Sequence, residues 1–76
     1  MNYIEYTFTI APMGIASEIL VAELAEVGFE SFVDTETGLQ AYIQEPFWNA
    51  DILSDIQILQ SEEFQITYTH QTIEQV

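Results

Sequence analysis

Carboxylate pairs are the side chains in this sequence whose type and spacing could do chemistry. Asp51 and Asp55 stand four residues apart, which would place them on one face of a helix, and Glu62 and Glu63 are adjacent. Such pairs can bind a hard cation or act together as acid and base. A dedicated calcium loop needs carboxylates at alternate positions, a glycine and a distal glutamate, and the sequence lacks that pattern. We therefore interpret both pairs as solvent-exposed charges and expect no metal site.

Other signs of catalysis are equally sparse. His70 is the one side chain whose ordinary pKa lies near neutrality, and the chain has neither a cysteine nor a second histidine to complete a metal or nucleophile site. The three glycines, Gly14, Gly28 and Gly38, are isolated, without the spacing of a dinucleotide or adenosyl site. We expect no catalytic residue, no cofactor and no enzymatic activity.

The charge balance is the most unusual property of the chain. Its 76 residues include 13 Asp and Glu but no Lys or Arg, which gives a formal net charge of −13. Any counter-charge for these carboxylates must come mainly from salt or from a basic partner, so added salt should stabilise the fold. Anionic surfaces are repelled by phosphate backbones and anionic lipids, so we expect neither a nucleic acid nor a membrane as partner. The hydrophobic content of 49% excludes a disordered acidic tail.

Hydrophobic periodicity predicts four strands and two helices. Alternation of apolar and polar residues is typical of half-buried strands, and apolar residues at i, i+4 and i+7 are typical of an amphipathic helix. We expect strands at 3–10, 29–34, 39–44 and 64–72. We expect helices at 15–27 and 49–60. Gly28 would cap the end of the first helix, Asn49 would begin the second, and Gly38 is able to take a positive φ in the turn between the middle strands.

The order β-α-β-β-α-β predicts an α+β fold formed by a single domain over residues 1–76. Right-handed crossovers would give a ferredoxin-like sandwich, with a four-stranded antiparallel sheet in the order 4-1-3-2 and two helices on one face. The expected core comprises Ile4, Tyr6, Phe8, Leu20, Leu24, Val27, Phe32, Ala41, Ile43, Ile52, Ile56, Leu59, Phe64 and Ile66. The expected open face carries Tyr3, Glu5, Thr7, Thr9, Tyr42, Gln65, Thr67 and Thr69.

Two aromatic pairs are candidate partner-binding residues. Phe47 and Trp48 stand in a connector beside Pro46, where they could anchor a partner or cap the open end of the core. Tyr3 and Tyr42 could form a protein-binding or dimerisation patch on the open sheet face, or could be ordinary cross-strand pairs.

The whole chain resembles the N-terminal domain of the ribosomal protein L11 methyltransferase (PrmA) family. The resemblance is carried by residues 1–8 (MNYIEYTF), 18–24 (EILVAEL), 26–32 (EVGFESF), 41–44 (AYIQ), 48–49 (WN), 51–53 (DIL) and 73–76 (IEQV). It implies a cytoplasmic, non-catalytic substrate-recognition domain with the fold described above, whose partner is a basic ribosomal protein. The family's catalytic domain, which binds S-adenosylmethionine, has no counterpart in these residues. We expect a monomer or a weak homodimer.

The missing cations depart from that family, whose members ordinarily have lysines on this domain. Polar uncharged residues fill exposed-looking positions where lysine would be ordinary: Gln40, Gln57, Gln60, Gln65, Gln71 and Thr72. We hypothesise an engineered version of the domain from which Lys and Arg were removed, to ask whether the fold needs them. Two other functions stay open, an acidic mimic of nucleic acid and a small-molecule-binding regulatory module.

Overall fold

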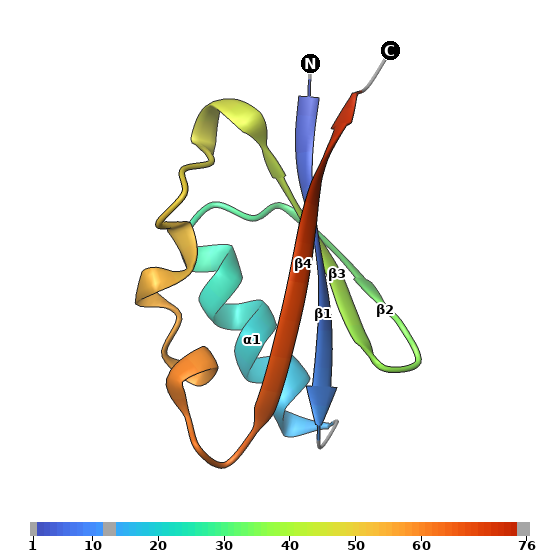
Figure 1. Cartoon of the computed structure of the whole chain (residues 1–76), viewed down its shortest axis with the longest axis vertical. Helices are drawn as coiled ribbons and strands as arrows, with labels where there is room; N and C mark the ends of the chain where they lie inside the picture. The colour runs from blue at the N-terminus through green and yellow to red at the C-terminus, as the bar shows by residue number, and fades with distance from the viewer. Residues whose placement is uncertain (1, 12–13, 75–76) are drawn as a thin grey trace.

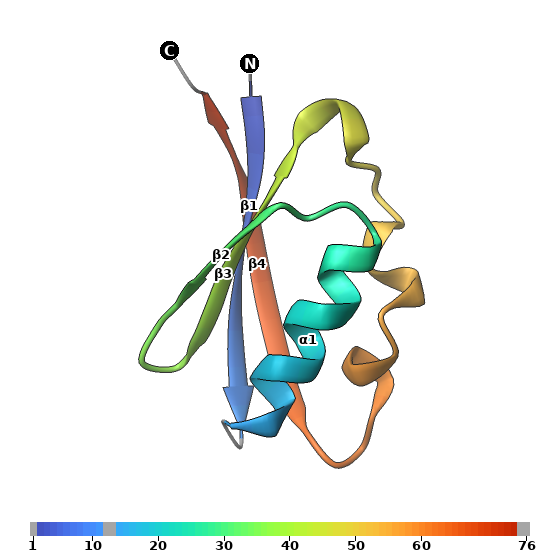
Figure 2. The same ribbon diagram turned by 180° about the vertical axis from the view of Figure 1, so that it is seen from behind.

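Four antiparallel strands form one sheet that is covered on one side only. The computed structural model describes residues 2–11 and 14–74. The strands are β1 (Asn2–Ala11), β2 (Ser31–Asp34), β3 (Gly38–Gln44) and β4 (Gln65–Glu74). Their order, β2-β3-β1-β4, confirms the predicted order, read from the other edge. Helix α1 (Ile15–Glu26) and three short 3-10 segments lie on one face of the sheet, and Figures 1 and 2 show the other face bare.

Strict alternation along β1 creates the core. Ile4, Tyr6, Phe8 and Ile10 are buried, and the residues between them lie on the open face. β1 is the central strand for pairing, since Tyr6 lies opposite Ala41 of β3 on one side and His70 of β4 on the other. The buried hydrophobic residues are Ile4, Tyr6, Phe8, Ile10, Ala16, Leu20, Leu24, Phe29, Leu39, Ala41, Ile43, Ile52, Ile56 and Ile58. None of the fully buried residues in the described part of the chain is polar or charged.

Glycines set both ends of α1. Gly14, at the N-cap position, has a φ of 104°, and its carbonyl accepts the Ser17 amide at 3.0 Å. At the other end Gly28 has a φ of 114°, as expected for the residue after a helix. The amide of Gly28 bonds the Ala25 carbonyl, and the amide of Phe29 bonds the Leu24 carbonyl at 3.1 Å. This Schellman arrangement satisfies carbonyls that the helix end would otherwise leave free.

Gly38 is required in the hairpin for a different reason from the one predicted. Gly38 does not have a positive φ; only Gly14 and Gly28 do among the described residues. Its backbone instead lies so close to β1 that a Cβ would collide with the Phe8 carbonyl oxygen. Glycine is therefore required here by the close approach of two backbones, and the hairpin turn is closed by the Thr35 amide bonding the Gly38 carbonyl at 2.9 Å.

The predicted second α-helix at 49–60 was wrong, so the two-helix ferredoxin-like sandwich is not confirmed. This part of the chain forms the 3-10 segments η2 (Ile52–Asp55) and η3 (Gln57–Gln60), which follow η1 (Glu45–Phe47). Ile56 between them is extended, with φ −84° and ψ 101°. An α-helix would direct the amides of Gln57 and Ile58 to carbonyls four residues back.

Those two amides bond a side chain from α1 instead. The Glu23 carboxylate accepts the Gln57 amide at 2.6 Å and the Ile58 amide at 3.1 Å. A carboxylate is a strong acceptor, so it competes well with the backbone carbonyls for these donors. The break turns Ile58 rather than Leu59 into the core; Val27, Phe32, Leu59, Phe64 and Ile66 are half-buried against it. Within the described ranges, no helix has the length and apolar character needed to cross a membrane.

Candidate protein-binding site

The structure brings Tyr3 and Tyr42 together on the open face of the sheet. In the β1–β3 register Tyr3 lies opposite Gln44 and Glu5 lies opposite Tyr42, so the two tyrosines are diagonal neighbours. With three further residues they line a depression of about 440 Å³, which we name the open-face groove. Its lining residues are Tyr3, Ser31, Val33, Tyr42 and Ile73, drawn from all four strands.

Hydrogen bonds to uncharged donors hold the carboxylates near this groove. Glu5 accepts the Tyr42 hydroxyl at 2.7 Å and the Gln71 side-chain amide at 2.8 Å. Glu30 accepts the Gln44 side-chain amide at 3.1 Å. These bonds fix the carboxylates without neutralising them. The negative charge therefore stays available to a partner.

The same carboxylates change the acidity of the two tyrosines. A hydrogen bond to Glu30, loss of hydration and the Glu30 charge together raise the pKa of Tyr3. A hydrogen bond to Glu5, loss of hydration and the Glu5 charge likewise raise the pKa of Tyr42. Both phenols are protonated at neutral pH. The Tyr42 hydroxyl donates its single proton to Glu5, so its oxygen is left as an acceptor for a partner.

The chemistry of the open-face groove suits a basic, partly apolar surface. Aromatic rings can hold the methylene stem of a lysine or the plane of a guanidinium, while a carboxylate binds the charged end. Val33, which is 49% exposed, and Ile73 add apolar contact area. Aromatic rings thus line the groove, and carboxylates lie near it in a chain that contains no Lys or Arg.

Phe47 and Trp48 lie apart from this groove, on the other side of the sheet. They belong to the layer formed by α1 and the three 3-10 segments, which we name the helix-side layer. The Trp48 Nε1 donates to the Tyr6 hydroxyl at 2.9 Å, and its ring centre lies 5.8 Å from that of His70. Trp48 is half-buried against the core, which is the capping role, whereas Phe47 is 63% exposed. The four predicted partner-binding residues therefore belong to two separate surfaces.

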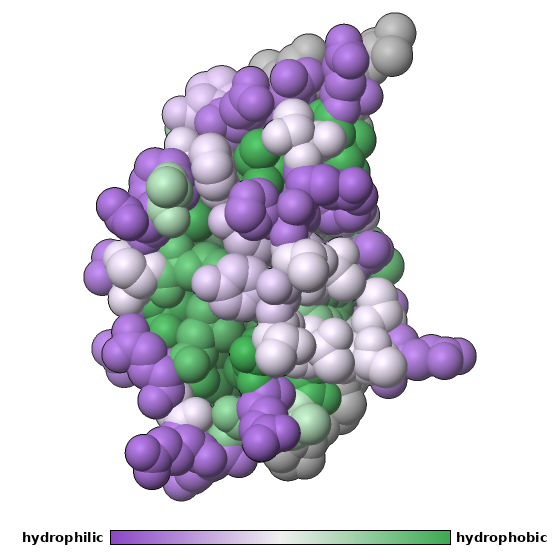
Figure 3. All heavy atoms as spheres, in the orientation of Figure 1, coloured by the Kyte–Doolittle hydropathy of each residue, from purple (hydrophilic) through white to green (hydrophobic). Residues whose placement is uncertain are grey.

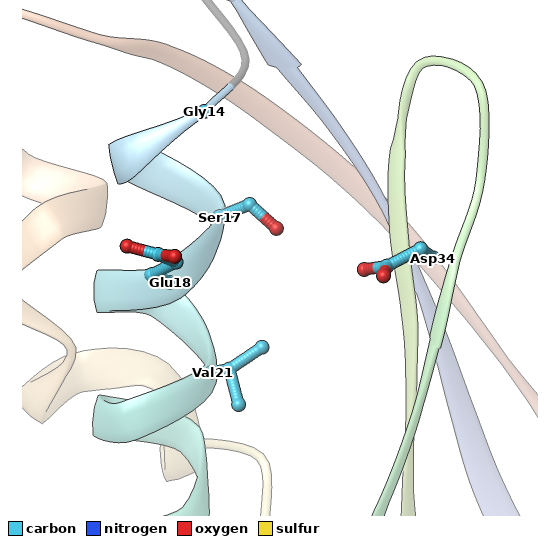
Figure 4. Close-up of a pocket in the computed structure, with 5 residues that line it drawn as sticks. All are labelled: Gly14, Ser17, Glu18, Val21 and Asp34. Carbon is cyan, nitrogen blue, oxygen red and sulfur yellow. The ribbon is translucent and has the colours of Figure 1, made fainter.

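A second hollow lies between α1 and the β2–β3 hairpin, with a volume of about 610 Å³. Ser17, Val21 and Asp34 point into it, whereas Glu18 points away (Figure 4). One carboxylate and one hydroxyl make a weak set of cation ligands. In residues 2–11 and 14–74, no group of three or more His, Cys, Asp or Glu side chains could hold a metal ion.

Sequence reasoning missed three of the five residues that line the open-face groove. Ser31 and Val33 share a parity along β2 that faces Gln40 and Tyr42, a signal visible once the hairpin register is known. Ile73 was missed because the last strand was expected to end near 72, whereas β4 continues to Glu74. Glu5 and Gln71 stand opposite each other in the β1–β4 register, and their bond could be inferred only from it.

Comparison with known proteins gives one consistent result. The chain is 46% identical over 54 residues to a ribosomal protein L11 methyltransferase of Bacteroides fragilis (strain ATCC 25285), which covers 70% of this chain and 19% of that protein. It is 39% identical over 72 residues to that of Bacteroides thetaiotaomicron, covering 92% of this chain and 26% of the relative. The methyltransferase of Porphyromonas gingivalis is 45% identical over 65 residues, covering 78% and 21%.

The matched part is small compared with the relatives. The chain spans only about a fifth to a quarter of the length of the curated methyltransferases it resembles. No protein-family model and no solved structure matches it.

Proposed function

We propose that this chain is a substrate-recognition domain of the ribosomal protein L11 methyltransferase family, acts in the cytoplasm and has no catalytic activity of its own. The observation that carries this proposal is identity of 39 to 46% to several such methyltransferases over most of the chain. The isolated positions of Gly14, Gly28 and Gly38 support a non-catalytic role, since a cofactor loop would need clustered glycines.

The open-face groove is the proposed contact surface for a basic ribosomal protein. Tyr3 and Tyr42 supply aromatic area that can become the centre of an interface, and Glu5 and Glu30 supply negative charge at its margin. The net charge of −13 would speed the encounter with a basic protein. Such binding would weaken as salt is added, because screening acts on both the encounter and the charge contacts.

Titration with purified ribosomal protein L11, followed by calorimetry and by amide NMR shifts, tests this proposal. We expect shifts centred on the groove and binding that weakens between low and physiological salt. Tyr42→Ala should weaken binding by about tenfold or more, as removal of a central aromatic contact does. Phe47→Ala is the matched control, an aromatic truncation on the other surface, and should change the affinity by less than about threefold.

Three outcomes would overturn this assignment. Absence of binding at millimolar protein would remove the recognition role. Equal loss on Phe47→Ala and Tyr42→Ala would remove the groove from the interface. Binding of polylysine as tightly as ribosomal protein L11 would favour the acidic mimic, since a mimic responds to charge alone.

We also propose that the absence of Lys and Arg was introduced by engineering. A glutamine amide donates to a carboxylate at a position where a lysine would be ordinary, as Gln71 does to Glu5. Aligned natural relatives should carry Lys or Arg at several of these glutamine positions. A natural gene that encodes the same cation-free stretch would contradict the proposal.

A further inference from the structure

The outer edge of β4 is long and exposed. The strand order places β2 and β4 at the two edges of the sheet, but β2 has four residues and β4 has ten. All residues of β4 are exposed except Ile66 and Ile73, which are half-exposed. An edge strand of this kind presents a row of backbone donors and acceptors that another strand can pair with.

The devices that usually protect such an edge are missing from β4. Natural edges are blunted by lysine, proline, bulges or short length. The sequence of β4, QITYTHQTIE, contains no Lys, Pro or Gly, and its one carboxylate, Glu74, lies at the end. Its pairing with β1 runs from Asn2↔Glu74 to Ala11↔Gln65 without interruption, so no bulge disturbs it.

The helix-side layer leaves aromatic rings uncovered beside this edge. Tyr68 is 46% exposed and packs against Tyr6 at 5.9 Å between ring centres, and His70 stacks on Tyr6 at 4.9 Å. With Trp48 these rings line a hollow of about 240 Å³. Figure 3 shows hydrophobic surface between β4 and the helix-side layer.

We propose that β4 pairs antiparallel with the β4 strand of a second copy of this chain, about a two-fold axis at Thr69. Residues that face each other across a continuous sheet must lie on the same face, which requires registers that pair odd with odd and even with even. Centring on Thr69 meets this condition, and Thr69 then faces its own copy. Tyr68 lies opposite His70 of the other copy, and Thr67 lies opposite Gln71.

This register suits the side chains on both faces. On the helix side, Tyr68 and His70 would meet their counterparts and extend the existing aromatic cluster, which favours ring contacts of about 4.5–7 Å. On the open side, Thr67 and Gln71 are polar residues that tolerate cross-strand pairing. Glu74 falls beyond the paired region, so no two carboxylates stand directly opposite each other.

Charge makes this association weak and sensitive to salt. Each copy carries a net charge of −13, so the copies repel at long range although their edges are nearly uncharged. Dissolved salt screens the charges and shortens the range of that repulsion, so pairing of the two copies strengthens as the salt concentration rises. A basic partner would behave in the opposite way. The two kinds of association are therefore separable by salt alone, and this inference does not depend on the proposed function.

Sedimentation equilibrium across a concentration and sodium chloride series tests the pairing. We expect the average mass to rise from 8.7 kDa towards twice that value, at lower protein concentration in high salt than in low salt. A mass of 8.7 kDa at every concentration and salt would overturn the proposal. Protection of β4 amides by an added basic extended peptide, without self-association, would assign the edge to that partner instead.

A matched pair of variants locates the interface. Thr69→Asp places two carboxylates opposite each other at the two-fold axis and should weaken self-association by about tenfold. Thr9→Asp adds the same charge on the same exposed face, one strand further in, and should weaken it by less than about threefold. Equal effects would place the interface elsewhere.

A measurement on the unmodified chain covers the case in which Thr69→Asp fails to fold. Hydrogen exchange at low and high protein concentration should show slower exchange of outward-facing amides in β4, with amides of β2 unchanged. Slowing of both edges, or of neither, would contradict pairing through β4.

Discussion

Helix α1 and the segment from 52 to 60 start from similar sequence patterns and reach different structures. Both carry apolar residues at helical spacing. α1 forms a 12-residue α-helix, whereas the other segment breaks at Ile56 into two 3-10 segments of four residues each. The difference lies at the ends: α1 is bounded by Gly14 and Gly28, both with positive φ, and 52–60 has no such glycine. The spacing of apolar residues selects which face of a segment is buried. The residues at the ends of the segment, and acceptors that compete for its amides, decide whether its backbone forms an α-helix.

Glu23 joins the two regions. It projects from α1 and accepts amides of Gln57 and Ile58, so an α-helical side chain takes the place of a cap for η3. An acceptor with a full charge satisfies two donors without any cation nearby. In a chain without Lys or Arg, carboxylates can thus hold tertiary structure through neutral donors. Substitutions can measure how far residues 45–60, which we name the 3-10 side, depend on that arrangement.

The largest expected effect separates the two regions by packing. Leu24 of α1 is fully buried, whereas Leu53 of η2 is half-buried. Leu24→Ala should lower the free energy of unfolding by about 3–5 kcal/mol, through lost transfer free energy and a cavity. Leu53→Ala should cost about 1 kcal/mol. Urea unfolding in ample sodium chloride measures both, and equal losses would mean that the two regions contribute equally to the core.

The next largest effect is a change in the free energy of unfolding that has opposite signs for two glutamates of α1. Glu23→Gln weakens two charge-assisted bonds and should lower the free energy of unfolding by about 1–2 kcal/mol, although it removes one negative charge. Glu26→Gln removes the same charge from an exposed site in the last turn, where the helix dipole disfavours an anion. It should stabilise the chain by about 0.3–1 kcal/mol. Stabilisation by both variants would show that charge repulsion outweighs the cap.

The sequence predicted correctly those parts of the fold in which local periodicity agrees with the contacts made to distant parts of the chain. Alternation along β1, the helical spacing in α1 and the strand order all follow from periodicity and connectivity. It was insufficient for 49–60, because the competing acceptor, Glu23, lies 34 residues before Gln57 and no local pattern reveals it. The close approach of Gly38 to Phe8 is likewise a property of two strands rather than of one turn.

The candidate partner-binding residues also include some that could be placed from the sequence and some that could not. Tyr3 and Tyr42 could be assigned to one face because parity along a strand fixes the face. Phe47 and Trp48 are neighbours in a connector, where no periodicity tells which ring turns inward. In the structure, the hydrogen bond from Trp48 to the Tyr6 hydroxyl and the burial of its ring distinguish Trp48 from the exposed Phe47.

A smaller effect tests that contact between Trp48, the residue after η1, and Tyr6 of β1. Trp48→Phe removes the indole donor to the Tyr6 hydroxyl and should lower the free energy of unfolding by about 1 kcal/mol. Phe47→Leu, at the exposed neighbour, is the control and should stay within about 0.5 kcal/mol. A larger loss at Phe47 than at Trp48 would contradict the capping role of Trp48. Thermal unfolding followed by circular dichroism is sufficient for the comparison.

The smallest effect concerns alkaline pH, where Tyr6 reports on the 3-10 side and Tyr42 on the open face. Burial is the main cause that raises the pKa of Tyr6, while Glu5 is the main cause at Tyr42. A phenol whose pKa is raised by folding keeps its proton longer in the folded chain. Its contribution to stability is therefore complete below about pH 10 and is lost as the pH rises through the folded pKa.

Tyrosinate absorbance in variants separates these causes. Glu23→Gln, by loosening 52–60 near Tyr6, should lower the pKa of Tyr6 towards its ordinary value and leave that of Tyr42 in place. Glu5→Gln should do the reverse, because the hydrogen bond and charge that act on Tyr42 are removed. If Glu23→Gln moved both tyrosines equally, the 3-10 side would not be a separately loosened region, and the contrast with α1 would be one of backbone form alone.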